Sequence, residues 1–305
     1  MIVIGGESLI DLIVYPGGRL AAIPGGGPFN TARTIARLGG SAAYLGRLST
    51  DRFGRTLLDR LVLDGVDCRL VQTTYEPTTL AVAELDDSGA ATYRFYVEGT
   101  SAPGLARDGP ADEALVSAKA LHVGTLGLVL EPMGTALESL VRGATDNIVV
   151  MVDPNCRPSA TPDPAALRAR VRRLAARADV IKVSHDDLSF LNPGVAADDA
   201  ARALLEVGPT AILVTDGGRA VRVIVGEAAI DLPVPLVDVV DTVGAGDAFG
   251  GAFLSAWIER GLGRADLADP DRLRPSVEFA IRVASETCRR AGAEPPTAAE
   301  MVESA

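Results

Sequence analysis

Strand patterns and helix patterns alternate regularly through the middle of the chain. Short apolar runs at residues 120–123, 148–153, 180–183 and 211–214 have the length and composition of buried strands. Helical patterns fill the intervals, at residues 132–142, 165–178 and 199–206. Strands that are separated by helices are typical of a parallel sheet covered by helices. The chain is therefore predicted to be an α/β protein with a mainly parallel central sheet.

Consecutive strands with no helix between them are predicted at residues 78–85 and 91–97. Such a pair does not belong to a core of alternating strands and helices, and residues 9–15 form a further extended segment with Asp11 in its middle. We expect these segments to form a small projecting sheet, from about residues 9–20 and 68–100, on a single domain that spans residues 1–305. An edge hairpin is expected at residues 221–232.

Composition argues against several classes of function. The formal net charge of −11 disfavours a nucleic-acid-binding surface and attraction to anionic lipid. Three widely spaced cysteines and two histidines argue against a disulfide framework and a zinc site. The chain begins on an apolar strand pattern without a signal peptide, and no apolar run approaches the roughly 18 residues needed to span a bilayer. We expect a cytoplasmic protein with neither a membrane nor a nucleic-acid partner.

Residues 241–253 read DTVGAGDAFGGAF and follow the apolar run at residues 236–240. The pattern predicts a strand that leads through a glycine turn into a helix. A helix N-terminus offers unpaired backbone N–H groups and the positive end of the helix dipole to an anion. The charge of Asp247 would repel a phosphate there, unless this carboxylate accepts a proton next to the phosphate. This is the position of a general base in a phosphoryl transferase.

Other interpretations of this stretch exist. An ordinary glycine-rich helix start would carry Asp247 as a first-turn charge. The spacing of Gly244, Gly246 and Gly250 also resembles a dinucleotide-binding fingerprint, but an oxidoreductase would carry it in its first strand-turn-helix unit. A P-loop is excluded because the sequence contains no Gly-Lys pair.

A second glycine turn, GGGPFN at residues 25–30, also leads into a predicted helix, at residues 31–38. Polar residues and glycines follow the predicted parallel strands, where ligands bind in such sheets. They are Gly124, Thr125, Asp153, Asn155, Arg157, Ser184, Asp187 and residues 215–218. The sequence therefore predicts one ligand-binding edge.

On these motifs the chain resembles the ribokinase-like, or PfkB, family of carbohydrate kinases over essentially its whole length. The two glycine turns carry the resemblance, and residues 49–54, 153–157 and 215–218 support it. The resemblance implies a three-layer α/β/α sandwich with a small β-sheet lid over the sugar site. It also implies that ATP is the phosphoryl donor, with Mg²⁺, and that two subunits can pair through their lids as a homodimer.

The resemblance assigns a role to each site residue. Asp247 is expected to be the base that takes the proton from a sugar hydroxyl. The N–H groups of Gly244, Ala245 and Gly246 would form an anion hole for the transferring phosphoryl group. The residues expected to hold the sugar are Asp11, Gly26, Gly27, Asn30 and Arg157. A surface salt bridge is the alternative interpretation of Arg157.

The donor side follows from the same resemblance. The residues expected to contact ATP are Lys182, Ser184, Thr215, Gly217 and Gly218. Asp187 is expected to hold Mg²⁺ through water, and the backbone of Asp241 and Thr242 to lie beside a monovalent cation such as K⁺. Ser184 and Asp187 replace the Asn and Glu usual in the family, and Asp216 replaces a Leu, which adds a negative charge near the expected triphosphate.

The sugar is less sharply indicated than the reaction. Residues 7–11 and 121–132 look most like the bacterial fructokinase branch, which makes fructokinase the leading prediction. Ribokinase and 2-keto-3-deoxygluconate kinase are close competitors. A sugar-binding relative without catalysis is the alternative from another class, and the presence of Asp247 in an intact anion-hole sequence argues against it.

Overall fold

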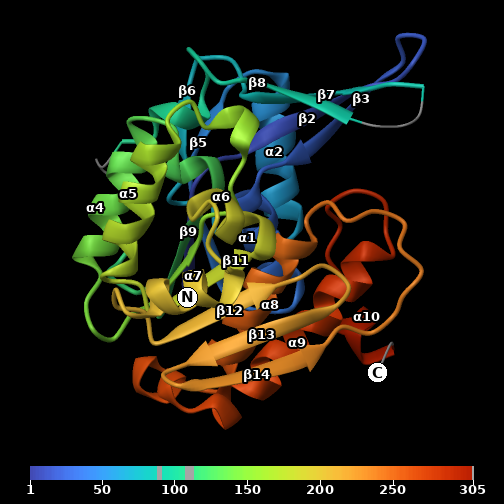
Figure 1. The fold of residues 1–305 in the computed structure, drawn as a ribbon. Coiled ribbons are helices and arrows are strands. Elements are labelled where there is room, and N and C mark those ends of the chain that lie inside the picture. The colour runs from blue at the N-terminus through green and yellow to red at the C-terminus, as the bar shows by residue number, and fades with distance from the viewer. Residues whose placement is uncertain (88–90, 107–112, 304–305) are drawn as a thin grey trace.

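A large sheet forms the centre of the molecule in this computed structural model, which describes residues 1–87, 91–106 and 113–303 (Figure 1). Its strand order is β14-β13-β12-β11-β10-β9-β1-β4. The strands are β1 (Ile2–Gly5), β4 (Ala42–Leu45), β9 (Ala120–Gly124), β10 (Val149–Asp153), β11 (Val180–Ser184), β12 (Ala211–Thr215), β13 (Ala220–Val225) and β14 (Ala228–Pro233). Among its described pairings only those of β12 with β13 and of β13 with β14 are antiparallel, so the predicted mainly parallel sheet is confirmed.

Helices cover both faces of this sheet (Figure 1). One face packs against α4 (Met133–Gly143), α5 (Pro164–Ala175), α6 (His185–Leu191) and α7 (Ala197–Leu205). The other packs against α1 (Gly27–Arg37), α2 (Arg52–Leu63), α8 (Ala245–Glu259), α9 (Pro270–Cys288) and α10 (Ala298–Glu303). Successive strand residues point to opposite faces, as when Val150 joins the first core and Met151 the second. The three-layer α/β/α sandwich is thus confirmed.

A second, four-stranded sheet projects from the sandwich, and we call it the lid (Figure 1). Its strands, in the order β3-β2-β7-β8, are β3 (Leu20–Gly25), β2 (Leu9–Val14), β7 (Leu80–Leu85) and β8 (Ala91–Tyr96). Strand β3 extends beyond the residues expected for this sheet. The strands β5 (Arg47–Ser49) and β6 (Gln72–Thr74) pair with each other in a separate small sheet.

One predicted strand is wrong. The apolar run at residues 236–240 forms no strand, and the Leu236 side chain is 99% exposed. The chain is instead anchored at one point, where the N–H groups of Val240 and Asp241 both donate to the carbonyl of Cys288 at the end of α9. The segment that leads into α8 is therefore a loop.

Some helix boundaries also differ from the prediction. Helix α1 begins at Gly27 because Pro28 fits the first turn of a helix, where no N–H partner is needed. Helix α9 begins at Pro270, capped by the Asp269 side chain, and contains Pro275. The sequence pattern did not indicate the short helix α6. Short 3₁₀ helices lie at η1 (Ala102–Gly104), η2 (Thr125–Leu128), η3 (Pro158–Ala160) and η4 (Arg264–Ala268). Within the described ranges, no helix is long and apolar enough to cross a membrane.

Substitution of Asp51, the N-cap residue of α2, tests how much the capped helix start contributes to the free energy of unfolding. Its carboxylate accepts from the N–H of Gly54 (2.7 Å), the N–H of Thr78 (2.8 Å) and the Thr78 hydroxyl (2.7 Å). Asp163 caps α5 through the N–H groups of Ala165 and Ala166. We expect the free energy of unfolding in urea to fall by about 2 kcal/mol for Asp51→Ala and by about 1 kcal/mol for Asp163→Ala. Equal losses would mean that the bonds to Thr78 add nothing.

Candidate active site

The N-terminus of α8 lies open at the edge of the sheet where the parallel strands end. Gly244, the N-cap residue, has φ 78°, and a Cβ at this position would lie 2.5 Å from Cβ of Ala293, so only glycine fits without strain. No side chain caps this helix end in the described part of the chain. Asp247 is the third residue of α8 and is buried. A buried carboxylate thus stands beside a helix N-terminus that can receive an anion.

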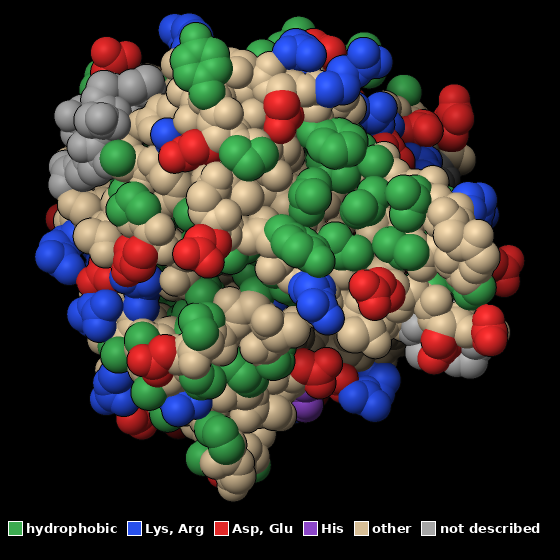
Figure 2. Space-filling model, turned by 90° about the horizontal axis from the view of Figure 1, so that it is seen from above, with side chains coloured by type: hydrophobic (Ala, Val, Ile, Leu, Met, Phe, Trp, Pro, Cys, Tyr) green, Lys and Arg blue, Asp and Glu red, His purple; other side chains and the backbone are tan. Residues whose placement is uncertain are grey.

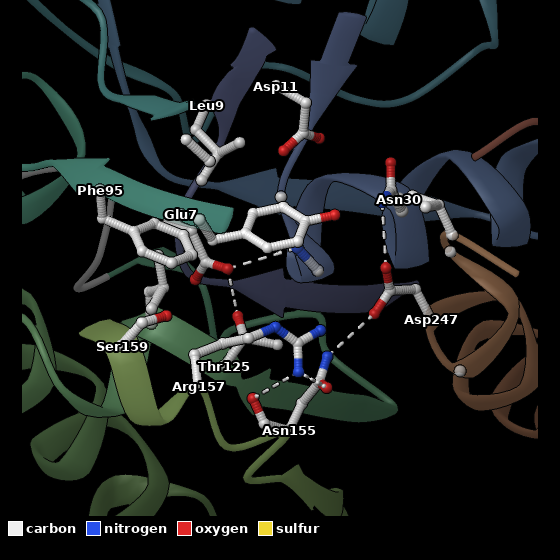
Figure 3. Close-up of a pocket in the computed structure, with 18 of the residues that line it drawn as sticks. Glu7, Leu9, Asp11, Asn30, Phe95, Thr125, Asn155, Arg157, Ser159 and Asp247 are labelled. Atoms are coloured by element: carbon white, nitrogen blue, oxygen red, sulfur yellow. Dashed lines mark hydrogen bonds between the residues drawn. The ribbon is translucent and has the colours of Figure 1, made fainter. Parts of the chain in front are cut away.

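Two side-chain amides hold the Asp247 carboxylate in place (Figure 3). Asn30 Nδ2 donates to Oδ2 (3.0 Å), and Asn155 Nδ2 lies 3.4 Å from Oδ1. The Thr31 hydroxyl also donates to the backbone carbonyl of Asp247 (3.3 Å). Burial raises the pKa of Asp247, while the hydrogen bond from Asn30 and the positive charges of Lys182 and Arg157 oppose this rise. The carboxylate is oriented and partly desolvated, as a proton acceptor requires.

A cavity of about 360 Å³ lies between α8, the lid and the sheet edge (Figure 3). It brings together these residues that the sequence predicted: Asp11, Gly26, Gly27, Asn30, Arg157, Thr242, Gly244, Gly246 and Asp247. Leu9, Ala81, Tyr93 and Phe95 contribute the lid side of the wall. We call this space the acceptor cavity.

Gly27 lies at the tightest point of the acceptor cavity wall. A Cβ on Gly27 would lie 2.4 Å from Thr125 Cγ2 and 3.2 Å from Asp247 Oδ1. Any larger residue would therefore displace η2 or the carboxylate. The second glycine turn of the sequence is explained by this close approach.

A second cavity, of about 340 Å³, lies on the other side of the α8 N-terminus. Its walls are largely apolar, with Val221, Phe249 and Ile281 among them, and it includes the predicted residues Thr215, Gly217, Gly218, Thr242, Ala245 and Gly246. Thr242 and Gly246 line both cavities. The apolar run at residues 236–240 contributes to this second wall, which explains why it is apolar without being a strand.

Lys182, Ser184 and Asp187 line neither cavity. Lys182 is buried within β11, and its ammonium group pairs with the Asp153 carboxylate (2.9 Å). A Cβ on Gly246 would lie 2.9 Å from Lys182 Nζ, so this lysine lies directly beneath the first turn of α8. Burial alone would lower the pKa of Lys182, but the charges of Asp153 and Asp187 raise it above its ordinary value. Lys182 therefore stays protonated.

Ser184 and Asp187 form the capping box of α6. The Asp187 carboxylate accepts from the N–H (2.8 Å) and hydroxyl (2.7 Å) of Ser184 and from the N–H of Cys156 (2.6 Å). A direct bond from Asp187 to Mg²⁺ does not fit this arrangement, and a contact through water stays a prediction. No group of three or more potential metal-ligating side chains occurs among the residues described.

The other residues singled out by their sequence have clear local roles. Asp241 accepts from the N–H groups of Val243 (3.0 Å) and Gly292 (2.9 Å), which fastens the turn before α8 to the chain after α9. The Asp216 carboxylate pairs with Arg219, which lowers the pKa of Asp216 and compensates the extra negative charge. Arg157 forms no salt bridge with any carboxylate in the described ranges; its guanidinium donates to Asn155 Oδ1 (2.6 Å).

Two further residues line the acceptor cavity: Glu7 was missed by the prediction, and Asn155 was predicted at the ligand-binding edge without a role. Glu7 is buried and accepts hydrogen bonds from Gly27, Thr125 and Gly127. Asn155 contacts Asp247 and has a φ of 37°. The position after a parallel strand indicated Asn155, after β10, and could have indicated Glu7, after β1.

The comparisons with known proteins agree with this geometry. The model of the pfkB family carbohydrate kinases matches residues 1–299. Probable fructokinase-5 of Arabidopsis thaliana is 33% identical, over 98% of this chain and 95% of the plant protein. The fructokinase of Xylella fastidiosa with bound ATP has a TM-score of 0.90 at 27% identity, over 99% of this chain and 97% of that chain.

A fructokinase double mutant from Vibrio cholerae O395, solved with fructose, ADP and a potassium ion, has a TM-score of 0.84 at 26% identity. The match covers 96% of this chain and 93% of that chain. Family model, relative and solved structures all extend over nearly the full length, so this chain belongs to the pfkB family of carbohydrate kinases.

Proposed function

We propose that this carbohydrate kinase is a fructokinase, which transfers the γ-phosphoryl group of ATP to a hydroxyl of fructose. The single observation that carries the phosphoryl transfer is that two cavities meet at the first turn of α8, with Asp247 in that turn. The fructokinase names of the relatives support the choice of sugar.

The charge of the acceptor cavity also supports a neutral sugar. Glu7, Asp11 and Asp247 bring three carboxylates to its wall, and Arg157 brings a positive charge. An acceptor that is itself a carboxylate, such as 2-keto-3-deoxygluconate, would be repelled by this surplus of negative charge. A neutral polyol can instead donate its hydroxyl hydrogens to the carboxylates.

The chemical step follows from the position of Asp247. Its carboxylate takes the proton of the attacking hydroxyl while the bond from this oxygen to the γ-phosphorus forms. The bond from the γ-phosphorus to the bridging oxygen breaks, and ADP leaves with the electron pair. Charge on the transferring oxygens is stabilised by the N–H groups and the dipole at the start of α8, from Gly244, Ala245 and Gly246.

Each substrate has its own set of contacts in this proposal. Asp11, Asn30 and Arg157 contact the sugar hydroxyls, and Gly26 and Gly27 let the sugar approach the backbone. The second cavity accepts the nucleotide, with its apolar walls on the adenine and Thr215, Gly217 and Gly218 towards ribose and phosphates. Lys182 attracts the triphosphate by its positive charge from beneath the first turn of α8. Ser184 contacts the triphosphate from the N-terminal end of α6.

Metal ions belong to the donor side. Mg²⁺ bound by the ATP phosphates would reach Asp187 through water, because its carboxylate is already held by three protein donors. A monovalent cation beside the Asp241 and Thr242 backbone is supported by the potassium ion of the Vibrio cholerae relative. Such a cation would stiffen the turn that presents Gly244.

The proposal also includes a quaternary structure, a homodimer that forms through the lid. Residues 1–305 form one kinase domain, and two copies pair through their lids as a homodimer. Large apolar side chains are exposed on lid strands, Leu20 on β3 and Tyr93 and Tyr96 on β8. Figure 2, which views the molecule from the side of the lid, shows hydrophobic side chains gathered among charged ones. Because ATP is the donor, we place the reaction in the cytoplasm.

A coupled assay with Mg-ATP and fructose, ribose, 2-keto-3-deoxygluconate or a nucleoside tests the function directly. We expect fructose to have the highest kcat/KM.

Asp247→Asn is expected to lower kcat by about 10²- to 10⁴-fold, because the amide cannot take the proton. Asp231→Asn, the same change on the exposed strand β14, should leave kcat unaltered. Turnover of Asp247→Asn within about tenfold of wild type rules out the base. Fructose binding without turnover by wild type would indicate a silent relative.

Asp11→Asn is expected to weaken fructose binding and at the same time to stabilise the folded protein. Burial and the charge of Asp247 raise the pKa of Asp11 to about 6, so the ionised carboxylate destabilises the folded state above pH 6. This effect disappears below the ordinary pKa of an aspartate, 3.8. The variant should therefore gain about 1 kcal/mol in free energy of unfolding at pH 8 and gain nothing at pH 3.5. Its KM for fructose should rise about tenfold through the lost acceptor. An equal gain at both pH values would contradict the electrostatic explanation.

A further inference from the structure

Glu7 is a buried carboxylate in the acceptor cavity, and no basic side chain of the described residues bonds to it (Figure 3). Its Oε1 accepts from the Thr125 hydroxyl and from the N–H of Gly27 (3.3 Å), and its Oε2 accepts from the N–H of Gly127 (2.9 Å). All three donors belong to the protein and come from two other segments. The carboxylate therefore connects β1, the start of α1 and η2.

These segments carry the two sides of the acceptor cavity. Gly27 is the first residue of α1, and the same helix presents Asn30 to Asp247. Thr125 begins η2, which follows β9 at the sheet edge. The two segments touch at the point where a Cβ on Gly27 would collide with Thr125. A small shift of η2 relative to α1 would change the shape of the cavity directly above Asp247.

The backbone at Thr125 needs to be held. Its φ of 52° lies in the left-handed region, which β-branched residues rarely adopt. Among the described residues the only other non-glycine with positive φ is Asn155, in the same cavity. Such strain persists only where the surroundings hold the residue in place. The bonds from Thr125 and Gly127 to Glu7 supply that hold at one end of η2.

We propose that Glu7 is a positioning residue for the acceptor: its carboxylate locks the Thr125 turn against the start of α1 and so sets the shape of the sugar site. This inference rests on the proposed sugar-kinase function. Three of the roughly four lone-pair positions of the carboxylate are taken by protein donors. Glu7 therefore acts through the cavity wall, in contrast to Asp11 and Asp247.

The lock requires a carboxylate. In Glu7→Gln, one of the two oxygens becomes an NH₂ group, which can only donate. If the NH₂ group replaces Oε2 it faces the N–H of Gly127, and if it replaces Oε1 it faces the N–H of Gly27. Either orientation loses one backbone partner while the volume of the side chain is kept.

The kinetic test compares Glu7→Gln with wild type on both substrates. We expect kcat/KM for the sugar to fall about 10- to 100-fold, since displacement of a site by about 1 Å costs that order of magnitude, while the KM for ATP stays within about twofold. Glu138→Gln is the matched control, because Glu138 is also a buried carboxylate but lies between α4 and α5 with Arg170 and Arg173. It should leave both constants unaltered. A Glu7→Gln enzyme with unchanged sugar kcat/KM, or with equal losses for sugar and ATP, overturns the proposal.

The partner of Glu7 provides a second kinetic test. Thr125→Val removes the hydroxyl and keeps the shape, and Thr125→Ser keeps the hydroxyl. We expect Thr125→Val to weaken sugar use in the same way, Thr125→Ser to restore it, and the double variant Glu7→Gln/Thr125→Val to lose less than the sum of the single variants. Strictly additive losses would mean that the two side chains act independently.

Amide hydrogen exchange tests the lock without any sugar. In Glu7→Gln, the amide that faces the new NH₂ group, that of Gly27 or that of Gly127, should exchange faster than in wild type, and in Glu138→Gln neither should. Unchanged exchange at both amides in Glu7→Gln would overturn the lock. If wild type phosphorylates no sugar, the proposed function fails, whereas the exchange experiment still decides the role of Glu7.

Discussion

The site depends on a carboxylate that is buried at the positive end of a helix. Burial disfavours the charge of Asp247, and the α8 dipole, two side-chain amides and the nearby Lys182 favour it. Lys182 does not approach Asp247 as a direct salt-bridge partner, because Asp153 holds it beneath α8. A directly paired lysine would lower the basicity of Asp247 and occupy its oxygens. The amides and Lys182 oppose the rise in pKa that burial causes, and they leave the carboxylate accessible to a proton.

The same helix start is supported from behind by a buried arginine. Arg33, on α1, donates to the carbonyl of Ala293 (2.9 Å) and pairs with Asp64 (2.6 Å) and Glu294 (3.0 Å). Ala293 in turn packs against Gly244. Helix α1 therefore supports the start of α8 at two points: Asn30 contacts Asp247, and Arg33 holds the chain behind the proposed anion hole. The wall of the acceptor cavity and the start of α8 are thus both held by the same helix, α1.

The sequence predicted the sandwich and the central motif because both are local patterns. Strand periods, glycine turns and the Asp247 position can be recognised within a dozen residues. The apolar run at residues 236–240 was misleading because apolar residues line a cavity as well as a sheet. The roles of Glu7 and Asn155 could not be read from local patterns, since Glu7 contacts Thr125 and Asn155 contacts Asp247, both far away in the sequence. Lys182 was recognised as unusual, but its pairing with Asp153 needed the fold.

The raised pKa values of the acceptor cavity indicate how sugar binding gains free energy. Burial raises the pKa of Glu7 to about 7 and that of Asp11 to about 6, and Asp247 shifts in the same direction. Each carboxylate in the empty cavity is thus less favourable in its ionised form than it would be in water. In the proposed function, sugar hydroxyls that donate to Asp11 and Asp247 would relieve this cost, while Glu7 keeps its donors from the protein. If a polyol binds there as proposed, the unfavourable burial of these carboxylates becomes a source of binding free energy.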